Sequence, residues 1–276
     1  MSDFEAASSI IGIVSSPQPA LADRAHYTSA VPCELPDGIR LVYADDRGRQ
    51  RTVGLHDANL VDFGLAKPLR KPAAYRGQRN FPGWWWSATT RTHVLYESWL
   101  ERHYIIEADR NAQVTGISGQ PFALAWPSGK KRDTAHFPDL FCRSVDGGGI
   151  VTDCHPSDRS DDDFRYKCAV TAAACQVAGW EFRVVGEPDP VWAANLRWIA
   201  GYRHPRFANP GIEELLVSAF AQPGVLSQTA MQAGDPIRVL PVLFHLLWRG
   251  RLTGDLSRPL GYGTMLTAAS DPLDQA

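Results

Sequence analysis

The stretch HFPDLFCRSVDGGGIVTDCHP, residues 136–156, decides the fold of this 276-residue chain. Two apolar-rich runs flank a turn at residues 146–149, where three consecutive glycines accept the positive φ angles that tight hairpins require. The pattern predicts two neighbouring strands. Asp139 lies on the first strand and Asp153 on the second, so we expect both carboxylates at one edge of a sheet.

Helical patterns lie on both sides of this hairpin. The segment VLYESWLE, residues 94–101, predicts a helix that carries Glu97 and Glu101. Acidic residues at the N-terminal end and a glycine at the C-terminal end predict a second helix over 161–178, and a strand follows at 181–185. The order predicts a mixed α/β fold, in which a small mixed sheet carries a helix on each face.

The segment GEPDP, residues 186–190, is the expected boundary between two domains. Ahead of the paired strands, residues 39–43 and 51–55 predict a small β hairpin, preceded by a loose segment rich in Ser, Ala and Pro. The chain is therefore divided into three regions, which are 1–75 (loose segment and hairpin), 76–186 (the domain with the acidic residues) and 187–276.

The C-terminal region is mostly helical by its apolar spacing. Its predicted helices are 191–202, 210–220, 226–230 and 235–249. Residues 252–260 then predict a short β wing, and three helices with a wing are typical of a winged-helix-like domain. The helix 235–249 is too apolar to suit a DNA-reading helix, which favours core packing or a protein partner over major-groove contact.

The bulk composition is that of an ordinary soluble globular protein, with 44% hydrophobic and 21% charged residues. A net charge of −2 argues against a protein that coats nucleic acid by charge alone, but it permits a local basic face. The first residues, MSDFE, are acidic, so no signal peptide is expected, and no apolar run is long enough to span a bilayer. Five cysteines without C-x-x-C pairing indicate free thiols in a reducing cytoplasm.

Two further segments leave alternatives open. Residues 65–83 are rich in basic side chains, namely Lys67, Arg70, Lys71, Arg76 and Arg79. Such a run is either a solvated linker or a phosphate-binding segment that leads into the carboxylate helix. The three consecutive tryptophans, 84–86, favour core and edge packing over a base-stacking platform.

Acidic residues in this order are suited to phosphodiester hydrolysis. Magnesium activates water and stabilises charge on phosphorus when oxygen ligands hold it at one end of a sheet. Carboxylates from two adjacent strands, Asp139 and Asp153, and one from a packed helix can converge there. His155 lies two residues beyond Asp153 and shares its face of the strand, where a cation would orient water or neutralise phosphate.

These residues resemble the PD-(D/E)xK nuclease superfamily, and within it the TnsA-like endonuclease subunit of heteromeric transposases. The resemblance covers residues 76–186 well and the C-terminal region more loosely. The motifs that carry it are Tyr96-Glu97-Ser98-Trp99-Leu100-Glu101-Arg102, Gln120-Pro121, Pro138-Asp139-Leu140 and Asp153-Cys154-His155-Pro156. It implies a restriction-endonuclease-like core followed by a winged-helix-like domain.

The resemblance also implies an activity and its parts. Glu101, Asp139 and Asp153 would be the catalytic and metal-binding acids, with Glu97 in reserve and Gln120 in support. The cofactor would be Mg²⁺, with Mn²⁺ as a substitute. Such subunits cut double-stranded DNA at transposon 5′ ends beside a DDE-type transposase, and their C-terminal region contacts an AAA+ ATPase regulator.

The chain departs from this family at the basic residue, because His155 stands where a lysine is expected. Three interpretations remain: a protonated His155, a cation supplied instead by Lys167 or Arg159, or a weak or inactive nuclease. The functional alternatives follow from these. The first is a magnesium-dependent endonuclease subunit, the second an inactive scaffold that links the DDE transposase to its ATPase regulator, and the third an independent restriction-like nuclease.

Overall fold

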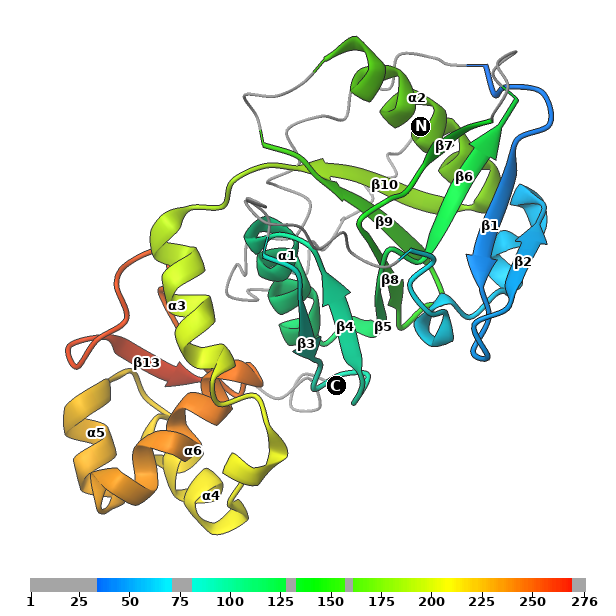
Figure 1. Ribbon diagram of the computed structural model, residues 1–276. Helices are drawn as coiled ribbons and strands as arrows, with labels where there is room; N and C mark the ends of the chain where they lie inside the picture. Colours follow the sequence, from blue (N-terminus) through cyan, green and yellow to red (C-terminus); the bar gives the residue numbers. More distant parts are fainter. Residues whose placement is uncertain (1–33, 71–80, 128–132, 157–160, 270–276) are drawn as a thin grey trace, which may run out of the picture.

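The computed structural model describes residues 34–70, 81–127, 133–156 and 161–269 (Figure 1). Over these ranges the protein is mixed α/β, as the sequence predicts. None of its described helices is both long and apolar enough to cross a membrane. The expectations for the loose N-terminal segment, for Lys71, Arg76 and Arg79, and for Arg159 concern positions outside the described residues.

The central sheet contains the paired strands of the acidic motif. Its order is β10-β9-β8-β5, and the strands are β5 (Val114–Gly119), β8 (Leu140–Ser144), β9 (Gly149–Cys154) and β10 (Trp180–Val185). β8 pairs antiparallel with both β5 and β9, whereas β9 and β10 run parallel. Gly147 takes φ 85° in the β8–β9 turn, which is the conformation that the glycine run predicts.

Helices cover both faces of this sheet, because side chains alternate along its strands. On β8, Leu140 packs with the core around α1 (Trp99–Arg110), whereas Phe141 packs with the core around α2 (Asp162–Ala178). The prediction of a mixed sheet with a helix on each face is confirmed. Asp161 caps the N-terminus of α2, and Gly179, at φ 71°, ends it as predicted.

The start of α1 differs from the expected helix over 94–101. Val94 and Leu95 belong to β4 (His93–Tyr96), which pairs with β3 (Gly83–Trp86), and the helix begins only after Ser98. The Ser98 hydroxyl accepts a hydrogen bond from the Glu101 amide at 3.1 Å, which fixes the helix start. Glu97 therefore lies in the loop before the helix and not one helical turn ahead of Glu101.

The expected hairpin forms, but it is hydrogen-bonded into the rest of the fold. Strands β1 (Arg40–Ala44) and β2 (Gln50–Val53) pair around a turn in which Asp45 accepts from the Arg49 amide. β1 also pairs with β6, in a second four-stranded sheet of order β2-β1-β6-β7. The remaining elements of this part are β6 (Phe122–Trp126), β7 (Thr134–His136), η2 (Leu55–Leu60) and η3 (Phe63–Leu65).

The C-terminal region is helical, as predicted, and ends in a small sheet (Figure 1). Its elements are α3 (Pro190–Ala200), η4 (Pro205–Phe207), α4 (Pro210–Ala219), β11 (Gly224–Val225), α5 (Leu226–Ala233), α6 (Pro236–Trp248), β12 (Leu252–Gly254) and β13 (Met265–Ala268). The wing was expected within 252–260, but the strand that pairs with β12 is β13, and Asn195 donates a hydrogen bond to the Leu256 carbonyl in the loop between them. Leu243, Leu246 and other apolar side chains of α6 are buried, so core packing explains its composition.

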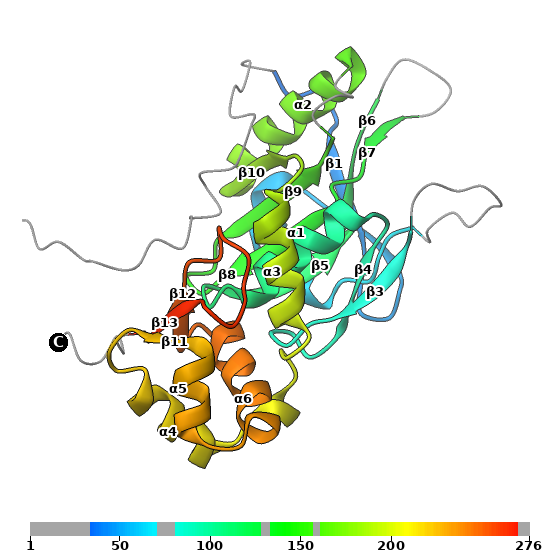
Figure 2. The ribbon, with the colours of Figure 1, turned by 90° about the vertical axis from the view of Figure 1, so that its left-hand side faces the viewer.

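The C-terminal helices pack on the α1 side of the central sheet. Figure 2 shows α3 beside α1, and one apolar core includes Ile105 of α1, Leu196 of α3 and Leu243 of α6. Arg110 of α1 donates a hydrogen bond to the carbonyl of Leu247 at 3.1 Å. The regions on either side of 186–190 are therefore joined by a common core, and the domain boundary itself stays a prediction.

Candidate active site

Asp139 and Asp153 lie across from one another on β8 and β9. Leu140 and Thr152 are paired residues of the two strands, so Asp139, just before β8, lies beside Asp153 in the same register. One Asp139 carboxylate oxygen, Oδ2, accepts a hydrogen bond from the Cys154 amide at 2.7 Å. The two aspartates therefore come from neighbouring strands at one edge of the sheet, as the sequence predicts.

Asp153 is almost fully buried, with 3% of its surface exposed. Its Oδ2 lies 2.8 Å from His136 Nε2, and the Cys168 thiol lies 3.9 Å from the same oxygen. Its Oδ1 is buried without a hydrogen-bond partner in the described structure. A buried carboxylate oxygen without a donor costs free energy, so this atom is suited to accept a proton donor or a cation.

Glu101 reaches the site from α1 and also caps that helix. Its Oε1 accepts from the Ser98 hydroxyl and its Oε2 from the Glu97 amide, both at 2.8 Å. This arrangement resembles a capping box, except that Glu101 accepts from the Ser98 hydroxyl and the Glu97 amide and not from the amide of the N-cap residue Ser98. Burial raises the pKa of Glu101, and the two hydrogen bonds oppose that rise. The residue thus has a structural role whether or not it takes part in chemistry.

The three acids share one electrostatic neighbourhood. The pKa of Asp139 is raised well above its ordinary range, first by desolvation and then by the negative charges of Glu101 and Asp153. The pKa of the Cys154 thiol is raised by burial and by the same three carboxylates. Like charges held together favour a proton or a metal cation between them. The structure thus brings the acids that the sequence singled out into one region.

Arg70 supplies a cation that the sequence suggested only as part of a basic run. Its Nη2 lies 3.0 Å from Glu97 Oε2, and its Nε donates to Gln120 Oε1 at 3.2 Å. The backbone amide of Gln120 in turn donates to the backbone carbonyl of Asp139 at 2.8 Å. Glu97 and Gln120, the expected supporting residues, therefore connect Arg70 to the acidic site.

Gln120 has an unusual backbone for its residue type. Its φ of 49° falls in the left-handed region, which costs free energy for a non-glycine residue. It is 1% exposed, and its Nε2 is buried without a partner among the described residues. A strained residue with an unused donor beside Asp139 fits a role in positioning the site.

His155 follows β9 and lies against α2. Its amide donates to the Val185 carbonyl at 2.9 Å, and its ring stacks on Phe164 with centroids 3.7 Å apart. The Nε2 atom is buried and has no described partner. Lys167, the alternative cation, instead pairs with Asp163 at 2.6 Å. The imidazole is therefore fixed by stacking, with one nitrogen left for a ligand or a proton.

His136 was not identified as a site residue from the sequence. It lies at the end of β7, and its contact with Asp153 makes it the nearest side-chain partner of that carboxylate. The only sequence signal was its position three residues before Asp139, which is too common a pattern to single it out. The contact brings together β7 and β9, which belong to different sheets, and sequence spacing does not encode how two sheets meet.

The donor chemistry of this edge fits magnesium, although no cluster of ligands is already assembled. Among the described residues, no group of three or more His, Cys, Asp or Glu side chains is arranged to hold a metal ion. Magnesium commonly binds through only one or two carboxylates and keeps several waters. The unpaired oxygen of Asp153 and the neighbouring carboxyl group of Asp139 meet that requirement.

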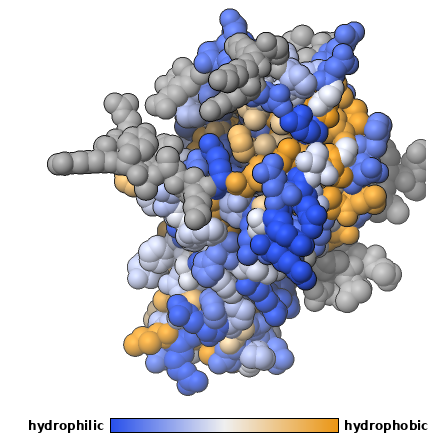
Figure 3. Space-filling model, turned by 45° about the vertical axis from the view of Figure 1, so that its right-hand side comes forward, coloured by the Kyte–Doolittle hydropathy of each residue, from blue (hydrophilic) through white to orange (hydrophobic). Residues whose placement is uncertain are grey.

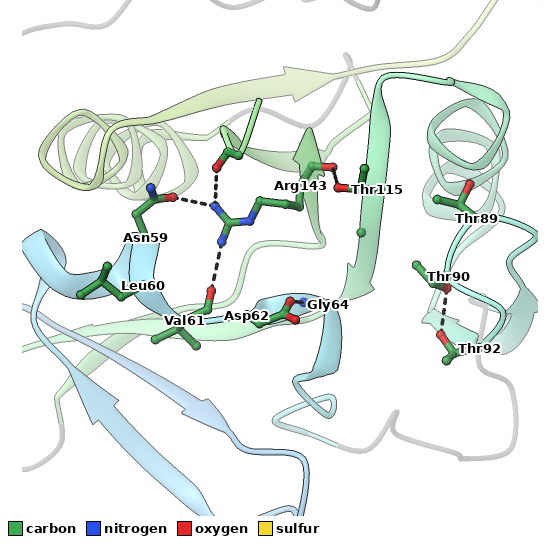
Figure 4. A pocket seen from close by; sticks show the side chains of 12 residues that line it. Asn59, Leu60, Val61, Asp62, Gly64, Thr89, Thr90, Thr92, Thr115 and Arg143 are labelled. Atoms are coloured by element: carbon green, nitrogen blue, oxygen red, sulfur yellow. Dashed lines mark hydrogen bonds between the residues drawn. The ribbon is translucent and has the colours of Figure 1, made fainter. Parts of the chain in front are cut away.

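A hollow lies elsewhere, at the opposite end of β8 (Figure 4). It encloses about 640 Å³ and is lined by Arg143, Thr115 and residues of the η2–η3 segment. Arg143 donates to Asn59 Oδ1, the Gly147 carbonyl and the Val61 carbonyl at 2.6, 2.9 and 3.0 Å. Because these bonds occupy the guanidinium in holding loops together, the hollow makes no case for a ligand site.

Large apolar side chains also reach the surface at separate places, among them Leu60, Trp84 and Trp99. On the face seen in Figure 3, hydrophobic areas are larger in the upper half of the molecule, and hydrophilic residues lie between them. The tryptophans at 84–86 alternate along β3, so Trp85 is buried and Trp84 is exposed. Core packing explains Trp85, whereas the exposed ring of Trp84 is accessible for contact.

Comparison with known proteins adds no relative. No protein-family model matches the chain, and no curated protein sequence matches it either. The function of the site is therefore inferred from its geometry alone.

Proposed function

We propose that this protein is a magnesium-dependent DNA endonuclease that works as a subunit of a heteromeric transposase. The observation that carries the proposal is geometric: the register of β8 and β9 sets Asp139 beside Asp153, whose Oδ1 is buried without a described partner at the edge of a mixed sheet. A desolvated carboxyl group that feels the negative charges of two others costs stability, so a catalytic use is the best account of this arrangement.

The proposal extends to the fold and the partners. The sheet with α1 and α2 on its faces would be a restriction-endonuclease-like core, and the helices after residue 190 with β12 and β13 a winged-helix-like domain. Double-stranded DNA at transposon 5′ ends would be the substrate. A DDE-type transposase and an AAA+ ATPase regulator would be the protein partners, the second bound through the C-terminal region.

Within this proposal, Asp139 and Asp153 would hold the metal, and Glu101 would complete the acidic edge. Bound Mg²⁺ or Mn²⁺ supplies a Lewis acid and lowers the pKa of water there. Arg70, through Glu97 and Gln120, fixes the Asp139 loop. His136 holds Asp153 Oδ2, which leaves Oδ1 available, and His155 offers Nε2 on the same face of β9.

The direct test is Mn²⁺ titration of the full chain by calorimetry, followed by nicking of a supercoiled plasmid. We expect binding by the parent and a loss of at least tenfold in affinity for Asp139→Asn, as when one ligand of a metal site is removed. Asp46→Asn, a change in the exposed turn between β1 and β2, is the matched control and should bind normally. Equal Mn²⁺ binding by the parent and Asp139→Asn would exclude the metal site.

A second function is favoured by one specific observation, the stacked His155. The His155 ring lies on Phe164, and the Lys167 ammonium group pairs with Asp163. Neither side chain therefore provides the unpaired cation that the lysine of an active nuclease would supply. In this alternative the protein is an inactive scaffold that links the transposase to its ATPase regulator. This alternative would be supported if the fully assembled complex bound Mn²⁺ but did not cleave DNA, and if His155→Lys restored the cleavage.

A further inference from the structure

A run of alternating arginine and aromatic side chains begins at the start of α1, the helix that carries Glu101, and crosses to the C-terminal region. We call it the arginine–aromatic ladder, and its members are Trp99, Arg102, Trp85, Arg203, Trp86 and His204, together with Arg206, whose amide donates to His204 Nδ1 at 3.0 Å. The Arg102 guanidinium lies 5.2 Å from the Trp99 ring centroid and 5.3 Å from that of Trp85. Arg203 lies 3.7 Å from Trp85, and the Trp86 and His204 rings stack at 4.8 Å.

The ladder is held in place by hydrogen bonds behind it. Trp85 is buried, and its Nε1 donates to Asp109 at 2.9 Å. Arg203 donates from Nε to the Trp86 carbonyl and from Nη1 to the Ala200 carbonyl, both at 2.9 Å. Side chains that are already ordered lose less entropy when they bind a partner.

The cations of the ladder are not neutralised by the described part of the chain. There, neither Arg102 nor Arg203 forms an ion pair with a carboxylate, and the same holds for the exposed Arg206 next to them. Burial lowers the pKa of Arg203, Asp109 opposes this effect, and Arg102 and Arg206 lower the pKa further. Three cations thus lie near one another with their charge unpaired.

Guanidinium groups stacked on tryptophan are suited to an extended polyanion. Arginine binds phosphate through a planar set of donors and keeps its charge while stacked on an aromatic ring. Trp99 and His204, at the two ends of the ladder, are exposed and can contact sugars or bases. An acidic protein surface would satisfy the charge but would make little use of the exposed rings.

The location of the ladder points to its occupant. Arg102 follows Glu101 directly in α1, and the ladder then passes over β3 to η4. We propose that the ladder binds the DNA backbone on one side of the bond to be cut and so aligns the duplex across both regions of the protein. This inference rests on the proposed function, because the acidic site is what gives the bound duplex its purpose.

The test is binding of a fluorescein-labelled DNA duplex of arbitrary sequence to the full chain, in EDTA and at several salt concentrations. Each of Arg102→Gln and Arg206→Gln should weaken binding by about tenfold, the loss typical of one hydrogen bond to a charged group. The slope of log affinity against log salt should fall by about 0.9 for each phosphate that the variant no longer neutralises. Arg258→Gln, a similarly exposed arginine in the C-terminal region, is the control and should leave both quantities unchanged.

Two results would overturn the inference. The first is a double variant, Arg102→Gln with Arg206→Gln, that binds the duplex with the parent's affinity and salt slope. The second is equal competition by polyglutamate, which would assign the ladder to an acidic protein partner instead. Because Arg206 is exposed and makes no described ion pair, Arg206→Gln remains informative if Arg102→Gln unfolds the protein.

The outcomes also separate this inference from the proposed function. Loss of Mn²⁺ binding at Asp139 with ladder-dependent DNA binding intact would remove the nuclease and leave a DNA-binding surface. If the ladder variants cleaved DNA as well as the parent at every DNA concentration, the ladder would be excluded as a DNA-binding surface and the proposed nuclease would remain.

Discussion

Asp109 and Asp153 are both buried aspartates, yet their surroundings differ in one respect. Asp109 accepts four hydrogen bonds, from Trp85 Nε1, the Ser87 hydroxyl and two backbone amides, at 2.7–3.0 Å. Asp153 has one carboxylate oxygen bound by His136 and the other without a described partner. The comparison teaches that burial alone does not mark a functional acid. A carboxylate with every donor in place holds the fold, and one left incomplete among like charges is available for chemistry.

The largest expected effect concerns the complete carboxylate. Asp109→Ala leaves the indole of Trp85, the Ser87 hydroxyl and two amides without an acceptor, and we expect it to lower the free energy of unfolding by about 3–5 kcal/mol. Urea denaturation followed by circular dichroism measures this. Asp163→Ala, at an exposed site, is the control. A decrease below about 1 kcal/mol would show that water replaces the carboxylate and that the comparison fails.

The incomplete region should respond in activity more than in stability. We expect His155→Ala to reduce the rate of DNA nicking by about 10²-fold, as for the loss of one positioned electrostatic group. His155→Lys should retain activity, because it restores a cation at that position. Nicking of transposon-end DNA by the assembled complex is the measurement, and Phe164→Leu tests the stacked position separately. An alanine variant as fast as the parent would remove His155 from the mechanism.

Removing charge from the acidic edge should stabilise the metal-free protein. Asp139→Asn keeps an acceptor for the Cys154 amide but ends the repulsion from Glu101 and Asp153, so we expect a gain of about 1 kcal/mol. Because the folded-state pKa of Asp139 is raised, the folded protein binds its proton more tightly than the unfolded chain does. The parent should therefore lose stability as pH rises from about 3.8, the ordinary value, through the raised pKa.

Urea denaturation of both proteins across that pH range, in EDTA, measures this difference. Asp139→Asn should show a flatter pH profile than the parent, and added Mn²⁺ should stabilise only the parent. Identical profiles for the two proteins would mean that the charge at Asp139 does not oppose folding.

The smallest effect is expected at Asp45, whose charge has partners on all sides. The backbone hydrogen bond from Arg49 is the main cause that lowers its pKa from 3.8 to about 2, with the Arg51 and Arg49 side chains adding to it. Its contribution to the hairpin is present above 3.8 and is lost as pH falls through about 2. The Arg49 amide shift in NMR spectra should follow this titration, and a midpoint near 3.8 would contradict it.

Local patterns in the sequence predicted much of the fold. The glycines at 146–149 encoded the β8–β9 turn, and Asp161 and Gly179 encoded the two ends of α2, because each of these features depends on neighbouring residues only. The two aspartates were also predicted correctly as neighbours on adjacent strands. The pattern 94–101 misled because Val94 and Leu95 fit both periods, and only pairing with β3 decides for a strand.

Long-range contacts account for what the sequence could not give. His136 meets Asp153 only because β7 and β9, which belong to different sheets, come together, and Arg70 meets Glu97 and Gln120 across three separate segments. Stacking of His155 on Phe164 depends on how α2 lies over the sheet. The residues in these contacts are not separated by a characteristic number of positions in the sequence. Composition and periodicity therefore cannot predict them.

The hydrogen bonds of Glu101 at the start of α1 give this residue a structural role that is independent of the proposed chemistry. Replacing Glu101 would remove two hydrogen bonds at the first turn of α1, whether or not the protein cleaves DNA. A relative that still has glutamate here has thus revealed nothing about whether it cuts DNA. Asp139 accepts one amide hydrogen bond, from Cys154, which asparagine can also accept, so under the proposed function replacement of Asp139 by asparagine would be the more telling sign of lost catalysis.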